Sequence, residues 1–133
     1  MNTKFRNACR SGDLEYIKNE LEGLSHLYIR HQGEYPHPIF FCASKGKNDC
    51  IEYISKKIGC PLESLMESIA IAAISGHLET VDKLFKIAKE FDPRHPRLVH
   101  ALNVCISKQN KKIVDYLWEK GIYVENKTFY NVK

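Results

Sequence analysis

The sequence predicts an all-α protein built from a repeated pair of short helices, and three observations lead to this fold class. A punctuating position recurs roughly every 33 residues. Two small or apolar residues lie three and four positions before it, and a β-branched residue lies five positions after it. The apolar residues around each such position recur at helical spacing. The punctuating positions are Gly12, Gly46, Gly76 and Gln109.

Each punctuating position is expected to separate two antiparallel helices. A glycine inside a helix costs about 1 kcal/mol relative to alanine, but glycine readily adopts the left-handed conformation that ends a helix. The segment AAISGHLETVDKLF (72–85) shows this division most clearly. In chain order, the expected helices cover 3–10 and 14–22, 38–45 and 48–58, 63–74 and 78–90, and 96–107 and 111–120.

The connections between the pairs are expected to differ from one another. In LYIRHQGEYPHP (27–38), Tyr28-Ile29-Arg30 suits a short extended piece, Gly33 a turn and Pro36 the approach to the next helix. The connection around GCPLE (59–63) is too short for such a finger. In FDPRHPR (91–97), the two X-Pro pairs end one helix and restart the chain.

The repeated segments resemble the ankyrin repeat, whose motif begins T-P-L-H-x-A and continues A-x-x-G-H-L-E-x-V-x-x-L. HPIFFCASKG (37–46) matches the first half, and AAISGHLETVDKLF matches the second half almost residue for residue. The first repeat keeps G-D-L-E at 12–15, and the fourth keeps the helix pattern and LWEKG at 117–121. The resemblance implies one domain over 1–133, an ankyrin-like solenoid of stacked helix pairs with short irregular β-turn fingers. Its repeats would cover about 3–35, 36–65, 66–95 and 96–122, followed by a C-terminal tail, 123–133.

The sequence departs from the ankyrin motif at three kinds of position. The threonine and histidine that stitch the family's turn are both replaced, which puts the regular turn geometry in doubt but not the helix stacking. Glutamine at position 109 is expected to strain or reshape the last turn. The replacements are His37, Glu67 and His100 for threonine, and Phe40, Ala70 and Asn103 for histidine.

Composition excludes several classes of protein. The chain has 133 residues, 44% of them hydrophobic and 27% charged, which is ordinary for a soluble domain able to bury a core. It has no apolar run of membrane-spanning length and no apolar core of a secretory signal near the N-terminus. Five cysteines, an odd number without a CxxC pair, favour free thiols in a reducing compartment and hence a cytoplasmic location.

Motifs for catalysis and metal binding are absent from the sequence. It contains no Walker loop, GxSxG elbow, HExxH or EF-hand loop, so we expect no catalytic residue, no cofactor and no metal. The pairs His31/His37 and His95/His100 lack the spacing and the partners of metal ligands. Cys42 and Cys105 fall in the small-residue column, so both are expected to be buried as small hydrophobes.

By resemblance, the expected function is binding another protein through the concave groove of an ankyrin array. The two residues before each punctuating position face that groove in the family, and the fingers extend it. Cations and serines prevail there, so we expect a mildly basic groove for an acidic or phosphorylated protein segment; the alternative is that these charges serve only solubility. The expected partner-binding residues are Arg10, Ser11, Ser44, Lys45, Ile74, Ser75, Ser107 and Lys108, with Tyr28, Arg30, His31, Tyr35, Arg94 and Arg97 from the fingers.

Two further alternatives and one expectation about the tail stay open from the sequence. A net charge of +4 slightly favours nucleic-acid binding, although a dedicated nucleic-acid binder usually has a denser basic cluster. Enrichment in Lys, Asn and Ile fits an AT-rich genome, so a viral or intracellular-bacterial protein acting on a host partner, in the host cytoplasm or nucleus, is one alternative. The tail 123–133 is expected to cover Tyr116 and Trp118 with Phe129 or Tyr130.

Overall fold

The chain is all-helical in the part that the structure describes. The computed structural model describes residues 3–30 and 36–122, and of 23–30 only the backbone; this part contains eight helices and no strand, which confirms the all-α class. The helices are α1 (Thr3–Ser11), α2 (Leu14–Arg30), α3 (Pro38–Ser44), α4 (Asn48–Ile58), α5 (Leu62–Ile74), α6 (Leu78–Ile87), α7 (Pro96–Ser107) and α8 (Lys111–Glu119).

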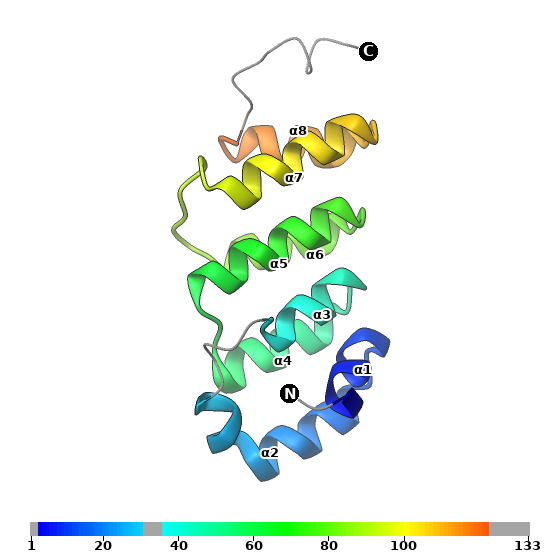
Figure 1. Cartoon of the computed structure of the whole chain (residues 1–133), viewed down its shortest axis with the longest axis vertical. Coiled ribbons are helices and arrows are strands. Elements are labelled where there is room, and N and C mark those ends of the chain that lie inside the picture. The colour runs from blue at the N-terminus through cyan, green and yellow to red at the C-terminus, as the bar shows by residue number, and fades with distance from the viewer. Residues whose placement is uncertain (1–2, 31–35, 123–133) are drawn as a thin grey trace.

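Consecutive helices form antiparallel pairs that follow one another along the long axis of the molecule (Figure 1). The first helices of the pairs contact one another in the order α1, α3, α5, α7, and the second helices α2, α4 and α6 do the same behind them. Helices α6 and α8 meet through Phe85 and Tyr116, whose ring centroids lie 5.9 Å apart. Two layers of helices therefore result, with the tight turns at one edge and the longer connections at the other (Figure 1).

The four tight turns share one backbone geometry. In each turn, the N–H after the punctuating residue donates to the carbonyl five positions earlier, as from His77 to Ala72 at 2.9 Å and from Asn110 to Cys105 at 3.0 Å. The three glycines have positive φ, and Gln109 adopts the same left-handed conformation with φ 60°. The last turn is therefore strained, a conformation that costs a non-glycine residue about 1–2 kcal/mol, but it is not reshaped.

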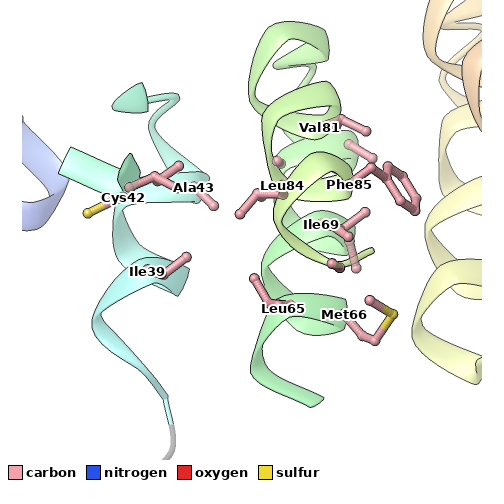
Figure 2. Close-up of a cluster of buried hydrophobic side chains, with 14 of the residues drawn as sticks. Ile39, Cys42, Ala43, Leu65, Met66, Ile69, Val81, Leu84 and Phe85 are labelled. Atoms are coloured by element: carbon pink, nitrogen blue, oxygen red, sulfur yellow. The ribbon is translucent and has the colours of Figure 1, made fainter. Parts of the chain in front are cut away.

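The core lies between the pairs, and the column of small residues lets neighbouring first helices approach closely. Leu65 and Leu84 point toward α3, whereas Met66 and Phe85 point toward the α7–α8 pair (Figure 2). The α5–α6 pair thus buries side chains on both of its flanks. Most members of the small-residue column and all members of the β-branched column are buried. The buried members are Ala8, Cys9, Cys42, Ala43, Ala72, Ala73 and Cys105 of the first column, and Ile17, Ile51, Val81 and Val114 of the second.

Polar contacts between the pairs join residues about one repeat apart. Tyr53 Oη donates to Glu22 Oε2 at 3.3 Å, and Tyr116 Oη donates to Asp82 Oδ1 at 2.7 Å. Buried Thr80 donates through Oγ1 to the Asn48 side-chain oxygen at 2.6 Å. These contacts span 31, 34 and 32 residues respectively, which matches the spacing of the punctuating positions. The sequence period is therefore also the period of the packing.

Helices α3 and α7 both begin at a histidine–proline pair. His37 Nδ1 accepts from the Ile39 N–H at 3.1 Å, and His95 Nδ1 accepts from the Arg97 N–H at 3.0 Å. Each imidazole therefore caps its helix as a threonine would. The proline that follows at N1 has no N–H, so it leaves no donor unpaired in the first turn. The other two replacements of the motif threonine, Glu67 and His100, lie inside α5 and α7 and do not cap a helix.

Two expected boundaries are also wrong. Helix α2 continues to Arg30, through the piece Tyr28-Ile29-Arg30 that we expected to be an extended finger. Apolar residues at helical spacing favour this continuation; they are Ile17, Leu21, Leu24 and Tyr28. Helix α6 ends at Ile87 rather than 90, since buried Ala88 leaves the helix and Phe91 turns back onto Phe85, with ring centroids 4.9 Å apart. The remaining helices agree with the expected bounds to within one residue.

Candidate functional site

The layer of first helices presents one side to solvent, which we call the first-helix face. It consists of four residues from each first helix or its C-cap, at six, five, two and one positions before the punctuating residue, which share one side of the helix. All of them except Phe41 and Ala70 are at least partly exposed. The face is defined as Arg6, Asn7, Arg10 and Ser11; Phe40, Phe41, Ser44 and Lys45; Ala70, Ile71, Ile74 and Ser75; and Asn103, Val104, Ser107 and Lys108.

The centre of this face is apolar. Phe40, Ile71, Ile74 and Val104 are partly exposed there, and Phe40 packs edge-on against Phe41 with ring centroids 5.6 Å apart. Small polar side chains and lysines lie at the end of the face near the tight turns. An apolar strip with a polar and cationic rim is the composition that protein-binding surfaces share.

Charge is distributed unevenly between the two layers of helices. Helices α1, α3 and α7 contain no carboxylate residue, whereas α2, α4, α6 and α8 each contain at least two. The only carboxylates of α5 are Glu63 and Glu67. Both are paired with α7 or its cap, Glu63 with His95 at 2.9 Å and Glu67 with Arg97 at 3.1 Å. The first-helix face itself therefore carries cations and no carboxylate.

Two arginines meet over one aromatic ring at the N-terminal end of the face. The guanidinium carbons of Arg6 and Arg10 lie 5.4 and 4.8 Å from the centroid of the Phe41 ring. Arg10 donates to the Asn7 side chain at 3.4 Å, and the Nε of Arg6 is buried without a hydrogen-bond partner. The ring attracts both cations through its negative face, but it accepts no strong hydrogen bond from either.

The structure divides the expected partner-binding residues between two edges of the molecule. The eight residues that precede the tight turns lie together at one end of the first-helix face, and all are at least partly exposed. Arg94 and Arg97 are exposed at the opposite edge, beside the connection into α7. Tyr28 and Arg30 belong to α2, and His31 and Tyr35 lie outside the described residues, as does the tail 123–133.

Several of these residues already have partners within the chain. Lys108 Nζ donates to the Ile74 carbonyl at 2.9 Å, which links the last two pairs, and Ser44 Oγ donates to the Phe41 carbonyl at 2.8 Å. Arg94 lies 3.7 Å from Asp92. Arg97 forms an ion pair with buried Glu67. The finger arginines therefore have local structural roles, and the tight-turn end of the face is the stronger candidate for binding.

A hollow of about 330 Å³ lies between the first two tight turns. It is lined by Gly12, Gly46, Lys47, Asn48, Asp49 and Cys50. Lys47 and Asp49, which have opposite charges, both line this hollow, so its electrostatic potential favours neither anions nor cations. Cys50 is buried, and the hydrogen bond from Cys42 lowers the pKa of its thiol.

Two further thiols have raised pKa values. Hydrogen bonding to neighbouring thiols, together with burial, raises the pKa of Cys42, and burial raises the pKa of Cys60 to about 12. Thiols with raised pKa values are poor nucleophiles at neutral pH. Across residues 3–30 and 36–122 there is no cluster of three or more His, Cys, Asp or Glu side chains suited to a metal ion. No helix in the same part of the chain is long and apolar enough to cross a membrane.

Comparisons with known proteins give no family for this chain. A scan against protein-family models, a search of curated proteins and a search of solved structures each found no match. The ankyrin resemblance therefore stays a prediction from the sequence motifs.

Sequence reasoning missed the N-terminal and central parts of the first-helix face. Arg6, Phe41, Ile71 and Val104 were not among the expected partner-binding residues, although all four belong to the face. The signal was present, because each lies three or four residues before a residue that was expected there and thus on the same side of its helix.

Proposed function

We propose that this chain is a divergent ankyrin-repeat protein that binds a partner protein through its first-helix face. The GHLE motif at 76–79, the small-residue columns and the period near 33 support the family. The stacked helix pairs, and the glycine or left-handed glutamine at every tight turn, are what such an array requires.

One observation carries the choice of surface, namely the separation of charge between the two layers. The face combines an apolar centre with Arg6, Arg10, Lys45 and Lys108, and it holds no carboxylate. A protein segment with acidic and apolar residues complements this surface in both charge and polarity. Arginine and aromatic residues are also the commonest anchors of protein interfaces.

Nucleic acid is the alternative partner, because the same cations could contact phosphates. We favour a protein because three of the four partly exposed apolar residues at the centre of the face, Ile71, Ile74 and Val104, are aliphatic and offer a base no stacking surface; Phe40 is the exception. Fluorescence anisotropy with labelled single-stranded and duplex oligonucleotides tests this choice. Micromolar binding that weakens steeply with added salt would favour nucleic acid.

Charge reversal on the face tests the proposed function. We expect the variant Arg10→Glu/Lys45→Glu/Lys108→Glu to lose the partners that the intact chain crosslinks and retains in a pull-down. Lys56→Glu/Lys86→Glu/Lys112→Glu is the matched control, since it makes the same change of charge on exposed lysines of the second-helix layer. Equal capture by both variants would remove the face from consideration. Circular dichroism checks that both are folded.

A further inference from the structure

The two arginines over Phe41 form a site without a counter-ion in the part of the chain that the structure describes. Like charges repel, and Arg6 and Arg10 share one ring although neither forms an ion pair within the described residues. Neither of the two helices that form the site contains a carboxylate, since α1 reads TKFRNACRS and α3 reads PIFFCAS. Elsewhere on the first-helix side the arginine of α7, Arg97, does have a carboxylate partner.

A second observation at this site is the buried Nε of Arg6. It is a strong donor out of contact with water and without an acceptor, which is a costly state for a charged group. Phe41 is almost fully covered, with 7% of the residue exposed, so its packed ring gives both guanidinium groups a fixed apolar surface to lie against. Two guanidinium groups beside one ring together offer several N–H donors to a single anion.

We propose that Arg6 and Arg10 bind an anionic side chain, a carboxylate or a phosphate, of the segment that docks on the first-helix face. This inference rests on the proposed function, because it takes the anion to belong to a partner protein. The acidic group would accept from the guanidinium donors, while apolar neighbours in the same segment would cover Phe40 and Ile71. The site fixes the position of the segment at the α1 end of the face.

The test uses the full chain with ¹⁵N-labelled arginine and follows the Nε–H resonances by NMR. Three probes are titrated separately: an acetylated hexaglutamate peptide, a phosphoserine peptide of the same length, and a single-stranded oligonucleotide. We expect the Arg6 and Arg10 resonances to shift with at least one peptide. The stronger of the two peptides identifies carboxylate or phosphate as the natural group.

Variants make the assignment specific. We expect Arg6→Gln/Arg10→Gln to bind the preferred peptide at least about tenfold more weakly than the intact chain, as is typical for lost hydrogen bonds to a charged group. The control is Lys18→Gln/Lys120→Gln, which removes two cations that also lie over aromatic rings, but on the second-helix layer. Thermal melting of both variants separates lost binding from lost folding, and Arg6→Lys/Arg10→Lys, which keeps the charge, should bind at an intermediate level.

The outcomes separate this inference from the proposed function. Unmoved Arg6 and Arg10 resonances, or equal affinity of the glutamine variant and the control, would overturn the anion site. If the Arg10→Glu/Lys45→Glu/Lys108→Glu variant nevertheless loses its protein partners, the first-helix face is still the binding surface and only the proposed anion site is overturned. Shifts caused by the oligonucleotide and by neither peptide would overturn both.

Discussion

His37 shows how one buried side chain can replace the threonine that the ankyrin motif places at a helix start. Its Nδ1 accepts from the Ile39 N–H, so the ring proton lies on Nε2 and points at the Gly59 carbonyl, 3.1 Å away. The side chain is 1% exposed, and burial lowers its pKa to about 4. Protonation would place a second proton on Nδ1, opposite the N–H that it caps, and would end the capping bond.

The free energy of unfolding should therefore decrease as the pH is lowered, because His37 becomes protonated. Because the folded-state pKa is below the unfolded value of 6.5, the contribution of His37 is fully present above pH 6.5 and is lost as the pH falls toward 4. The difference in pKa corresponds to at most about 3 kcal/mol. Urea unfolding monitored by circular dichroism between pH 7.5 and 4 measures this loss.

The variant His37→Thr separates this effect from the titration of other groups. Threonine keeps a capping oxygen but does not titrate, so we expect the fall in stability between pH 6.5 and 4 to be smaller than in the intact chain. Exposed His100 provides the control, since His100→Thr should leave the pH profile nearly unchanged. An identical slope in the His37→Thr protein would show that the buried imidazole does not control it.

At the scale of elements, the tight turns decide where each helix ends. Gly76 and Gln109 hold equivalent places with φ 86° and 60°, and the N–H of each donates to the carbonyl three positions earlier at 3.0 Å. A Cβ added at Gly76 would meet Asn110 Nδ2 at 3.8 Å, an ordinary contact. The difference between the two turns is therefore backbone strain and not crowding.

Exchanging these two residues should move stability in opposite directions. We expect Gln109→Gly to stabilise the protein by about 0.5–1 kcal/mol, because strain relief of about 1–2 kcal/mol is partly offset by the greater freedom of glycine in the unfolded chain. Gly76→Gln should destabilise by a similar amount. Chemical denaturation gives both values.

Gly46 serves as the contrasting position for that experiment. An added Cβ there would lie 3.0 Å from the His77 ring, so Gly46→Ala should cost more than Gly76→Ala through crowding in addition to strain. If Gln109→Gly lowers the midpoint of unfolding, side-chain contacts of Gln109 outweigh its strained backbone.

For the whole molecule, each helix pair depends mainly on its immediate neighbours. The substantial contacts between first helices join α1 to α3, α3 to α5 and α5 to α7. Stability in such a row is approximately a sum of pair and interface terms, so the effect of a substitution depends on its position. Ile69 lies in the central part of the row and Ile113 in the last described pair, and both are fully or almost fully buried.

Substitution of these two isoleucines should therefore give different patterns of hydrogen exchange. Each Ile→Ala change is expected to cost about 2–5 kcal/mol. Ile113→Ala should lower protection chiefly in α7 and α8, whereas Ile69→Ala should lower it on both sides of α5. Equal loss of protection throughout the chain in both variants would mean that the row unfolds as one cooperative unit.

The sequence by itself determined the helix pairs, their order and most of their ends. Local chemistry suffices for this, because the glycines, the small-residue columns and the X-Pro pairs act within a few residues of where they stand. The same local signals failed at residues 23–30 and 88–90. There, apolar spacing beyond the expected end extended α2, and burial of Ala88 with packing of Phe91 on Phe85 shortened α6.

Only the tertiary structure decided which charged and aromatic residues share a surface. Arg6 and Phe41 are 35 positions apart in sequence order, and no local pattern relates them; stacking α1 against α3 brings them within 5.4 Å. Stacking also pairs Glu67 with Arg97, so one expected binding residue forms an ion pair within the chain. The physical reason is that helix ends depend on near neighbours in the chain, whereas a binding surface depends on contacts between repeats.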